Sequence, residues 1–284
     1  MSVPGRMATS AEPTPVQPGR APGGVPTDLT GELEVLGRVT DSSNLAVLAR
    51  LVENPDVHVI YKPVRGERPL WDFPDGTLAG REVAARVVSD LGGWGLVPPT
   101  ILRDGPLGPG SVQQWIGDPF SPLDDDEVVD LVPAGRAPEG WLEVLDGETP
   151  TGAAVTVVHS GADDVRSLAV LDAVLNNSDR KGSHCLRDEN GRLWAIDHGV
   201  SFSPTPKLRT VLWGWAGQPL PEAELERLRG LASRLADAAT RDLLRDLLPE
   251  ADVVALVSRV DRLLADRRHP RPSRDWPSVP WPPL

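Results

Sequence analysis

The chain has 284 residues, a formal net charge of −12 and a single cysteine, Cys185. This length supports one large domain or two lobes with a substantial core. The acidic balance argues against nucleic acid as the main partner, because phosphate binding needs a basic face, and a lone cysteine excludes an intrachain disulfide. The sequence has no apolar run near the ~20 residues of a membrane helix and no signal-peptide core. We therefore expect a cytoplasmic protein without a transmembrane segment.

The N-terminal third of the chain predicts a disordered tail followed by a small sheet with one helix. Residues 1–29 are rich in proline and glycine and poor in large apolar side chains, so we expect them to stay disordered. Residues 78–91 place apolar side chains at helical spacing and end at Gly92-Gly93. Alternating or β-branched runs typical of antiparallel strands cover residues 31–39, 45–52, 57–62, 97–102 and 111–116.

The middle of the chain, residues 117–160, carries an acidic run at 124–127, several prolines and glycines, and only short apolar runs. We expect a long, irregular connection whose acidic residues are solvated. The sequence then becomes mainly helical from residue 161 to 269. Helices are predicted from about residue 165 to 175 and over 222–235, 241–248 and 250–264, with an aromatic-rich segment of no evident form at 207–217.

The last residues, 270–284, form a proline-rich tail that contains Trp276 and Trp281. Two tryptophans in such a tail indicate that it docks on the body of the protein. The whole chain thus predicts an α+β fold with a sheet lobe at residues 30–116 and a helical lobe at 161–269. Two unlike lobes suggest a cleft between them.

A hairpin is the strongest local signal in the helical lobe. Asn190-Gly191 lies between two short apolar runs, and both turn positions of such a hairpin require positive φ. Folding the chain back brings His184, before the first strand, close to Asp197, after the second. Asp179 lies on the loop just before them. Two carboxylates and an imidazole in one small volume either hold a cation or repel one another.

Four charged residues now stand in a recognisable order: Lys62 at the end of a strand, Glu82 on the helix of the first lobe, Asp179 on a loop, and Asp197 before a glycine-containing turn. This order resembles the protein-kinase-like fold. It is most similar to the atypical branch of phosphatidylinositol 3-/4-kinase-like and HipA-like enzymes, and to an actinobacterial group described as phosphatidylinositol kinase-like. The segments 176–184 and 208–215 carry that likeness.

The resemblance implies ATP and Mg²⁺ as cofactors and a role for each residue. Lys62 would hold nucleotide phosphates and Glu82 would orient Lys62. Asp197 would bind Mg²⁺, and Asp179 would position the acceptor hydroxyl. The resemblance also implies that Arg180 or Lys181 steadies the transferred group. Further nucleotide contacts are expected at Ser42, Ser43 and Asn44 for the phosphates and at Gln114, Trp115 and Ile116 for the adenine.

Two departures from the family pattern keep alternatives open. His184 stands where the family has asparagine as its second metal ligand, and imidazole favours Mn²⁺ over Mg²⁺. Residues 40–44 also lack a glycine-rich loop. The leading prediction is an ATP-dependent phosphotransferase acting on a hydroxyl of a protein, small molecule or lipid. The alternatives are a nucleotide-binding pseudokinase without turnover and a metal-dependent phosphohydrolase built on His184, Asp197 and His198.

Overall fold

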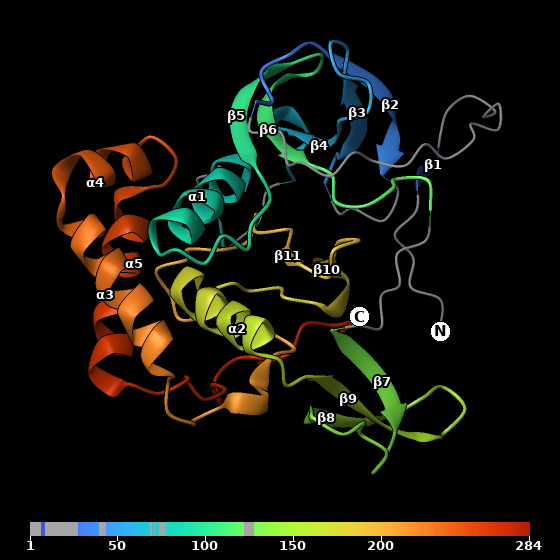
Figure 1. The fold of residues 1–284 in the computed structure, drawn as a ribbon, viewed down its shortest axis with the longest axis vertical. Helices are drawn as coiled ribbons and strands as arrows, with labels where there is room; N and C mark the ends of the chain where they lie inside the picture. The colour runs from blue at the N-terminus through green and yellow to red at the C-terminus, as the bar shows by residue number, and fades with distance from the viewer. Residues whose placement is uncertain are drawn as a thin grey trace.

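The structure is a computed structural model that describes residues 7–8, 28–39, 44–68, 70, 72–73, 78–121 and 128–284. Within these ranges it is an α+β protein with antiparallel sheets and five α-helices (Figure 1). The predicted α+β class is therefore confirmed. No helix in the described ranges is long and apolar enough to cross a membrane.

The N-terminal part of the chain forms a six-stranded sheet in the order β1-β2-β3-β4-β6-β5, with antiparallel neighbours throughout. The five predicted strands are all present within it. The strands are β1 (Met7–Ala8), β2 (Leu33–Val39), β3 (Val47–Leu51), β4 (His58–Pro63), β5 (Thr100–Gly105) and β6 (Gly108–Gln114). Part of the predicted disordered tail is ordered: β1 pairs with β2, and Leu29 is fully buried in the core of the sheet.

Helix α1 (Leu78–Leu91) has the bounds that the sequence predicts. Its buried Ala84, Ala85 and Val88 belong to the same core as the C-terminal helices, rather than to the core of the sheet. Arg81 forms a buried ion pair with Asp252 of the last helix at 2.6 Å. The helix that carries Glu82 is therefore fixed to the helical part of the molecule.

The expectation of an irregular connection over residues 117–160 is wrong for the part of this segment that the structure describes. It contains a second sheet in the order β7-β9-β8, made of β7 (Val129–Pro133), β8 (Trp141–Glu148) and β9 (Ala154–Ser160). The prolines and glycines that suggested irregularity lie mainly between the strands, whereas the short β-branched runs bury Val129 and Val157 in the main core. The acidic run at 124–127 lies outside the described residues.

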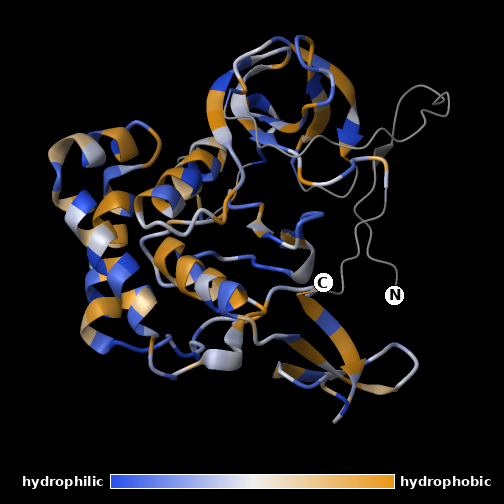
Figure 2. Cartoon of the chain, in the orientation of Figure 1, coloured by the Kyte–Doolittle hydropathy of each residue, from blue (hydrophilic) through white to orange (hydrophobic). Residues whose placement is uncertain are grey.

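The main core surrounds α2 (Asp163–Leu175), whose Leu168, Leu171 and Leu175 are fully buried. The predicted hairpin follows as β10 (Cys185–Arg187) and β11 (Leu193–Ala195). Its turn differs from the expected one: of Asn190 and Gly191, only Gly191 has positive φ, and the loop spans residues 188–192, where the Asp188 N–H donates to the Arg192 carbonyl. Three further helices complete this part: α3 (Glu222–Ala236), α4 (Ala238–Arg245) and α5 (Glu250–Asp266). Short 3₁₀ turns occupy Val64–Gly66, Gly182–His184 and Trp213–Trp215. Figure 2 shows hydrophobic residues along α2 and β7, as well as on the other helices and the strands of the large sheet.

The C-terminal tail docks on the body, as the sequence predicts. The Gly182 N–H donates to the carbonyl of Pro283 at 2.9 Å, and the Thr210 N–H donates to that of Ser278 at 3.0 Å. Backbone groups, the partly buried Val279 and Leu284, and Trp276, whose ring centroid lies 5.0 Å from Lys207 Nζ, make the contact. Trp281 takes no such part, since it is 80% exposed. The tail therefore covers one side of the loop that contains Asp179.

Candidate functional site

The structure brings Lys62 of β4 together with Glu82 of α1 and Asp197 after β11. The alternation of β4 buries Tyr61 in the sheet core and turns Lys62 to the other face. The Lys62 ammonium lies 2.5 Å from Glu82 Oε1 and 2.8 Å from Asp197 Oδ1. Burial alone would lower the pKa of Lys62, but the two carboxylates raise it above its usual value. The ammonium is therefore charged at neutral pH, and its side chain keeps 22% of its surface exposed.

Glu82 also fixes the backbone beside Asp197. Its second oxygen accepts a hydrogen bond from the His198 N–H at 2.9 Å. Asp197 itself has φ +60°, in the left-handed region that is uncommon for residues other than glycine. Lys62 holds the pKa of the Asp197 carboxyl well below its usual range, so this half-exposed group is ionised. A strained, ionised carboxylate is typical of a functional site.

His184 approaches the other oxygen of the same carboxylate, as the hairpin predicts. Its Nε2 lies 3.4 Å from Asp197 Oδ2. Burial lowers the pKa of His184 to about 4, so the imidazole is neutral at pH 7, the form that binds metals. Its buried Nδ1 has no hydrogen-bond partner among the described groups. His184 Nε2 and Asp197 Oδ2 thus lie close enough together to be neighbouring ligands of one cation.

The donor set limits which metal arrangement fits. Within the described ranges, no group of three or more His, Cys, Asp or Glu side chains is arranged to hold a metal ion. A cation held by His184 and Asp197 would therefore complete its shell with water or with oxygens of a bound phosphate, as Mg²⁺ commonly does. The chain fits a cation that arrives with a phosphate ligand better than a permanently bound ion.

Asp179 lies close to this cluster, with Lys181 beside it. Burial raises the pKa of Asp179; the Lys181 ammonium, 3.2 Å from its Oδ2, opposes that shift, and the charge of Asp197 adds to it. The Asp179 N–H donates to Asn177 Oδ1 at 3.0 Å, which holds the turn. A carboxyl with a raised pKa is a better hydrogen-bond acceptor for a hydroxyl than an ordinary aspartate.

Arg180 does not occupy the place expected of a group that contacts the transferred phosphate. Its side chain is fully buried and pairs with Asp172 of α2 at 3.0 Å. The reason is that α2 is central and carries a carboxylate on a buried face, which draws the guanidinium inward. Of the two cations predicted for this role, Lys181 is the one whose side chain is partly exposed.

The hydrolase set of three ligands does not form. His198 is fully buried, and its Nε2 lies 2.8 Å from Arg180 Nη2, so this nitrogen faces a cation rather than a metal position. His184 and Asp197 are the members of that set that meet. The arrangement of the described residues therefore does not fit a phosphohydrolase built on all three residues.

The predicted nucleotide-contact segments are only partly described. Ser42 and Ser43 lie outside the described residues, and the side chain of Asn44 accepts a hydrogen bond from the Arg68 N–H at 2.8 Å. At the end of β6, the N–H groups of Gln114 and Trp115 donate to carbonyls within the sheet. Their contact with a nucleotide stays a prediction.

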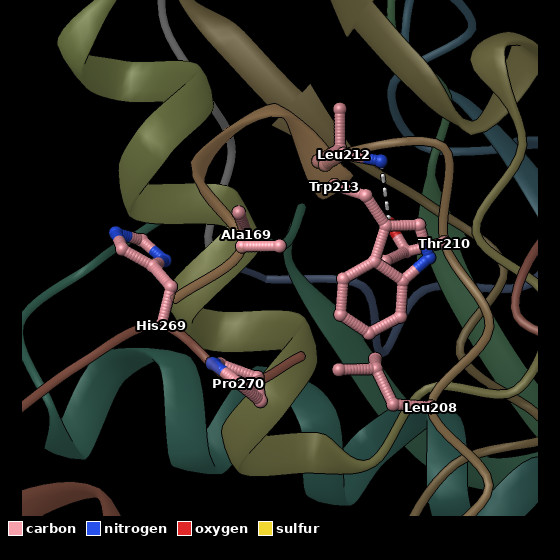
Figure 3. A pocket seen from close by; sticks show the side chains of 8 residues that line it. Ala169, Leu208, Thr210, Leu212, Trp213, His269 and Pro270 are labelled. Carbon is pink, nitrogen blue, oxygen red and sulfur yellow. Dashed lines mark hydrogen bonds between the residues drawn. The ribbon is translucent and has the colours of Figure 1, made fainter. Parts of the chain in front are cut away.

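Ile116 belongs to a small apolar cluster beside the cluster of charged residues. It packs with Leu186 and Trp194 of the hairpin, and Ile196, which directly precedes Asp197, packs against the same group. This cluster links the end of the N-terminal sheet to the metal-side carboxylate. A separate pocket (Figure 3), lined by Leu208, Trp213, His269 and other residues, contains none of the predicted site residues.

Sequence reasoning did not assign a role to Asp172, which binds Arg180, the residue that directly follows Asp179. The signal was present, because a carboxylate on a helix that is apolar nearly all round must find a buried cation. Its partner was not predictable, since Arg180 reaches it across a turn whose direction depends on the tertiary packing.

Comparison with known proteins gives one informative relation and no assigned activity. No family model matches the chain. The chain is 43% identical over 258 residues to "Protein Rv2133c" of Mycobacterium tuberculosis, which covers 89% of this chain and 92% of that protein. This identity and coverage show a common family, and the chain belongs to the family of that mycobacterial protein.

Proposed function

We propose that this member of the Rv2133c family is an ATP-dependent phosphotransferase with a kinase-like, bilobal fold. It resembles the phosphatidylinositol 3-/4-kinase-like and HipA-like atypical kinases. One observation carries the proposal: Lys62, Glu82 and Asp197, from three separate elements, meet within hydrogen-bonding distance. A cation on a strand, its helix carboxylate and a metal-side carboxylate are the parts that γ-phosphoryl transfer requires.

Each residue has a task that follows from its position. Lys62 places a fixed positive charge where nucleotide phosphates would bind, and Glu82 holds Lys62 and the backbone of His198 at once. Asp197 and His184 would hold a divalent cation, Mg²⁺ or Mn²⁺, which supplies charge neutralisation when it is bound with the nucleotide. Ile196, the partly buried member of the apolar cluster at Ile116, and the partly exposed Gln114 and Trp115 are where the adenine ring would make contact.

The acceptor is a hydroxyl compound on this proposal. Asp179 accepts a hydrogen bond from the attacking hydroxyl, and Lys181, 3.2 Å from Asp179, faces the charge that develops on the transferred group. The net charge of −12 opposes approach to an anionic membrane surface. We therefore favour a hydroxyl of a protein or small molecule over that of a lipid.

A second candidate, a nucleotide-binding pseudokinase, is favoured by a different observation. Both oxygens of Asp197 already face protein groups, Lys62 on one side and His184 on the other. If these contacts persist when nucleotide binds, the phosphates are held without being transferred. Binding without turnover would support this candidate over the enzyme.

The test is ATP consumption by the purified chain, measured as ADP formed with Mg²⁺ or Mn²⁺. We expect turnover that stops when a chelator removes the metal and that falls at least a hundredfold in D197N. The matched control is D164N, which removes a carboxylate of similar exposure at an Arg187 pair on α2. A wild-type chain that neither binds nor consumes ATP with either metal would refute both candidates.

A further inference from the structure

The Arg180 guanidinium uses all of its N–H groups inside the protein. Its Nε donates to the Asp172 carboxylate at 3.0 Å. Its Nη1 donates to the carbonyls of His184 at 3.1 Å and Ile196 at 2.8 Å. Its Nη2 donates to Asp172 at 3.0 Å and to His198 Nε2 at 2.8 Å. A guanidinium has five N–H donors, so this fully buried side chain has none to spare.

Arg180's partners either belong to the candidate site or lie directly beside its residues. Ile196 and His198 flank Asp197 on either side, and His184 is the second candidate metal ligand. Arg180 itself directly follows Asp179. The guanidinium therefore joins the acceptor-side loop to the metal-side ligands. Through Asp172, the guanidinium is also bound to α2, a helix that is packed in the middle of the core and so has little freedom to move.

We propose that Asp172, Arg180 and His198 form a positioning network that sets where Asp179 stands relative to His184 and Asp197. None of the three contacts the reactants; they act through the residues that do. The inference rests on the proposed function, because it assigns the network a role in holding the metal–nucleotide complex. It also gives a role to Arg180, which the sequence placed among the groups touching phosphate and which turns toward Asp172 of α2 instead.

The network has a strict chemical requirement at each position. Lysine in place of Arg180 keeps the charge opposite Asp172 but cannot reach the two carbonyls and the imidazole together, because it lacks the planar fork. His198 must accept at Nε2, since Arg180 Nη2 can only donate. Glutamine can supply an acceptor oxygen there, whereas phenylalanine cannot and would leave a buried N–H unpaired.

The experiment measures Mn²⁺ affinity by electron paramagnetic resonance in the presence of a non-hydrolysable ATP analogue. The variants are R180K, H198F and H198Q, with R187K as the matched control. Arg187 makes an Arg–Asp pair with Asp164 on the same helix, outside the network. Outer-shell partners of metal ligands are commonly worth 10–100-fold in metal affinity. We expect R180K and H198F to weaken Mn²⁺ binding at least tenfold, and H198Q and R187K to stay within threefold of wild type.

Thermal unfolding of each variant separates loss of position from loss of fold. If R180K does not fold, the comparison of H198F with H198Q, which differ in the acceptor, decides the question. Wild-type Mn²⁺ affinity in folded R180K and H198F would overturn the network, as would equal weakening in H198Q and H198F. A wild-type chain that binds no Mn²⁺ with the analogue would instead refute the proposed function itself, which R180K cannot do.

Discussion

Glu82 is the residue on which the two halves of the site converge. It is 3% exposed, and its two oxygens serve different partners, the Lys62 ammonium and the His198 N–H. A buried carboxylate is tolerated when protein donors replace the water molecules that would otherwise bond to its oxygens, and both oxygens of Glu82 have such donors. The loss of stability on replacing Glu82 therefore has two parts, one from the charged Lys62 and one from the neutral His198 N–H.

Two substitutions of Glu82 separate the contributions of its two partners to stability. E82Q keeps an acceptor for the His198 N–H but loses the charge opposite Lys62, and E82A loses both. We expect E82A to lower the free energy of unfolding by about 3 kcal/mol, as for a broken buried ion pair. E82Q breaks the same ion pair but leaves an amide oxygen as an acceptor, so fewer buried donors lose their partner and the cost should be lower, about 1 to 2 kcal/mol. Urea unfolding at pH 7 measures both, and equal losses in the two variants would contradict the dual role.

At the scale of elements, helix α1 is attached to the helical part of the molecule more firmly than its place in the sequence suggests. Its Ala84, Ala85 and Val88 pack in the main core, and Arg81 pairs with Asp252 of α5. Gly80 permits a close approach: a Cβ there would lie 2.4 Å from the backbone oxygen of Leu247. Because α1 carries Glu82, this attachment also fixes the partner of Lys62.

The substitution G80A should therefore push α1 away from Leu247. Alanine is the better helix former by about 1 kcal/mol, but the backbone oxygen cannot move aside cheaply, so we expect a net destabilisation of about 1 to 3 kcal/mol. G230A is the matched control on α3, because nothing lies within 4 Å of its added Cβ. G230A should stabilise the protein in urea unfolding. If G80A stabilised it as much, the close packing of α1 would be refuted.

At the scale of the whole molecule, a buried histidine joins the β7-β9-β8 sheet to the aromatic turn Trp213–Trp215. His159 of β9 donates from Nδ1 to the Ser160 carbonyl at 2.9 Å and accepts at Nε2 from the Gly214 N–H at 3.0 Å. The Gly214 N–H requires an unprotonated Nε2, so this arrangement holds the ring in its neutral form. Burial accordingly lowers the pKa of His159 to about 4.

This pKa shift predicts how stability depends on pH. Between pH 6.5 and about 4 the unfolded chain binds a proton at His159 that the folded chain does not, so stability falls as the pH is lowered. From pH 7 to pH 5 this one residue should remove about 1 to 2 kcal/mol. Urea unfolding at the two pH values measures it. H159N should be less stable at pH 7 and lose less between pH 7 and 5; an unchanged pH dependence would contradict the assignment.

Local patterns in the sequence predicted the elements that carry the site. The features that they did not predict depend on how these elements pack against one another. The helical repeat and its glycine stop gave the bounds of α1, and Asn190-Gly191 gave the closeness of His184 and Asp197. The β7-β9-β8 sheet escaped because its strands are short and separated by proline and glycine. The direction of Arg180 escaped because it depends on Asp172, whose helix faces the loop only after folding.

The most direct test of the central claim is calorimetric titration of ATP into the purified chain with Mg²⁺, with Mn²⁺ and with a chelator. We expect binding of one nucleotide that requires a divalent cation and weakens at least tenfold in K62M, which removes the ammonium and keeps the aliphatic stem. Metal-independent binding, unchanged affinity in K62M, or no binding of ATP with either cation would contradict it.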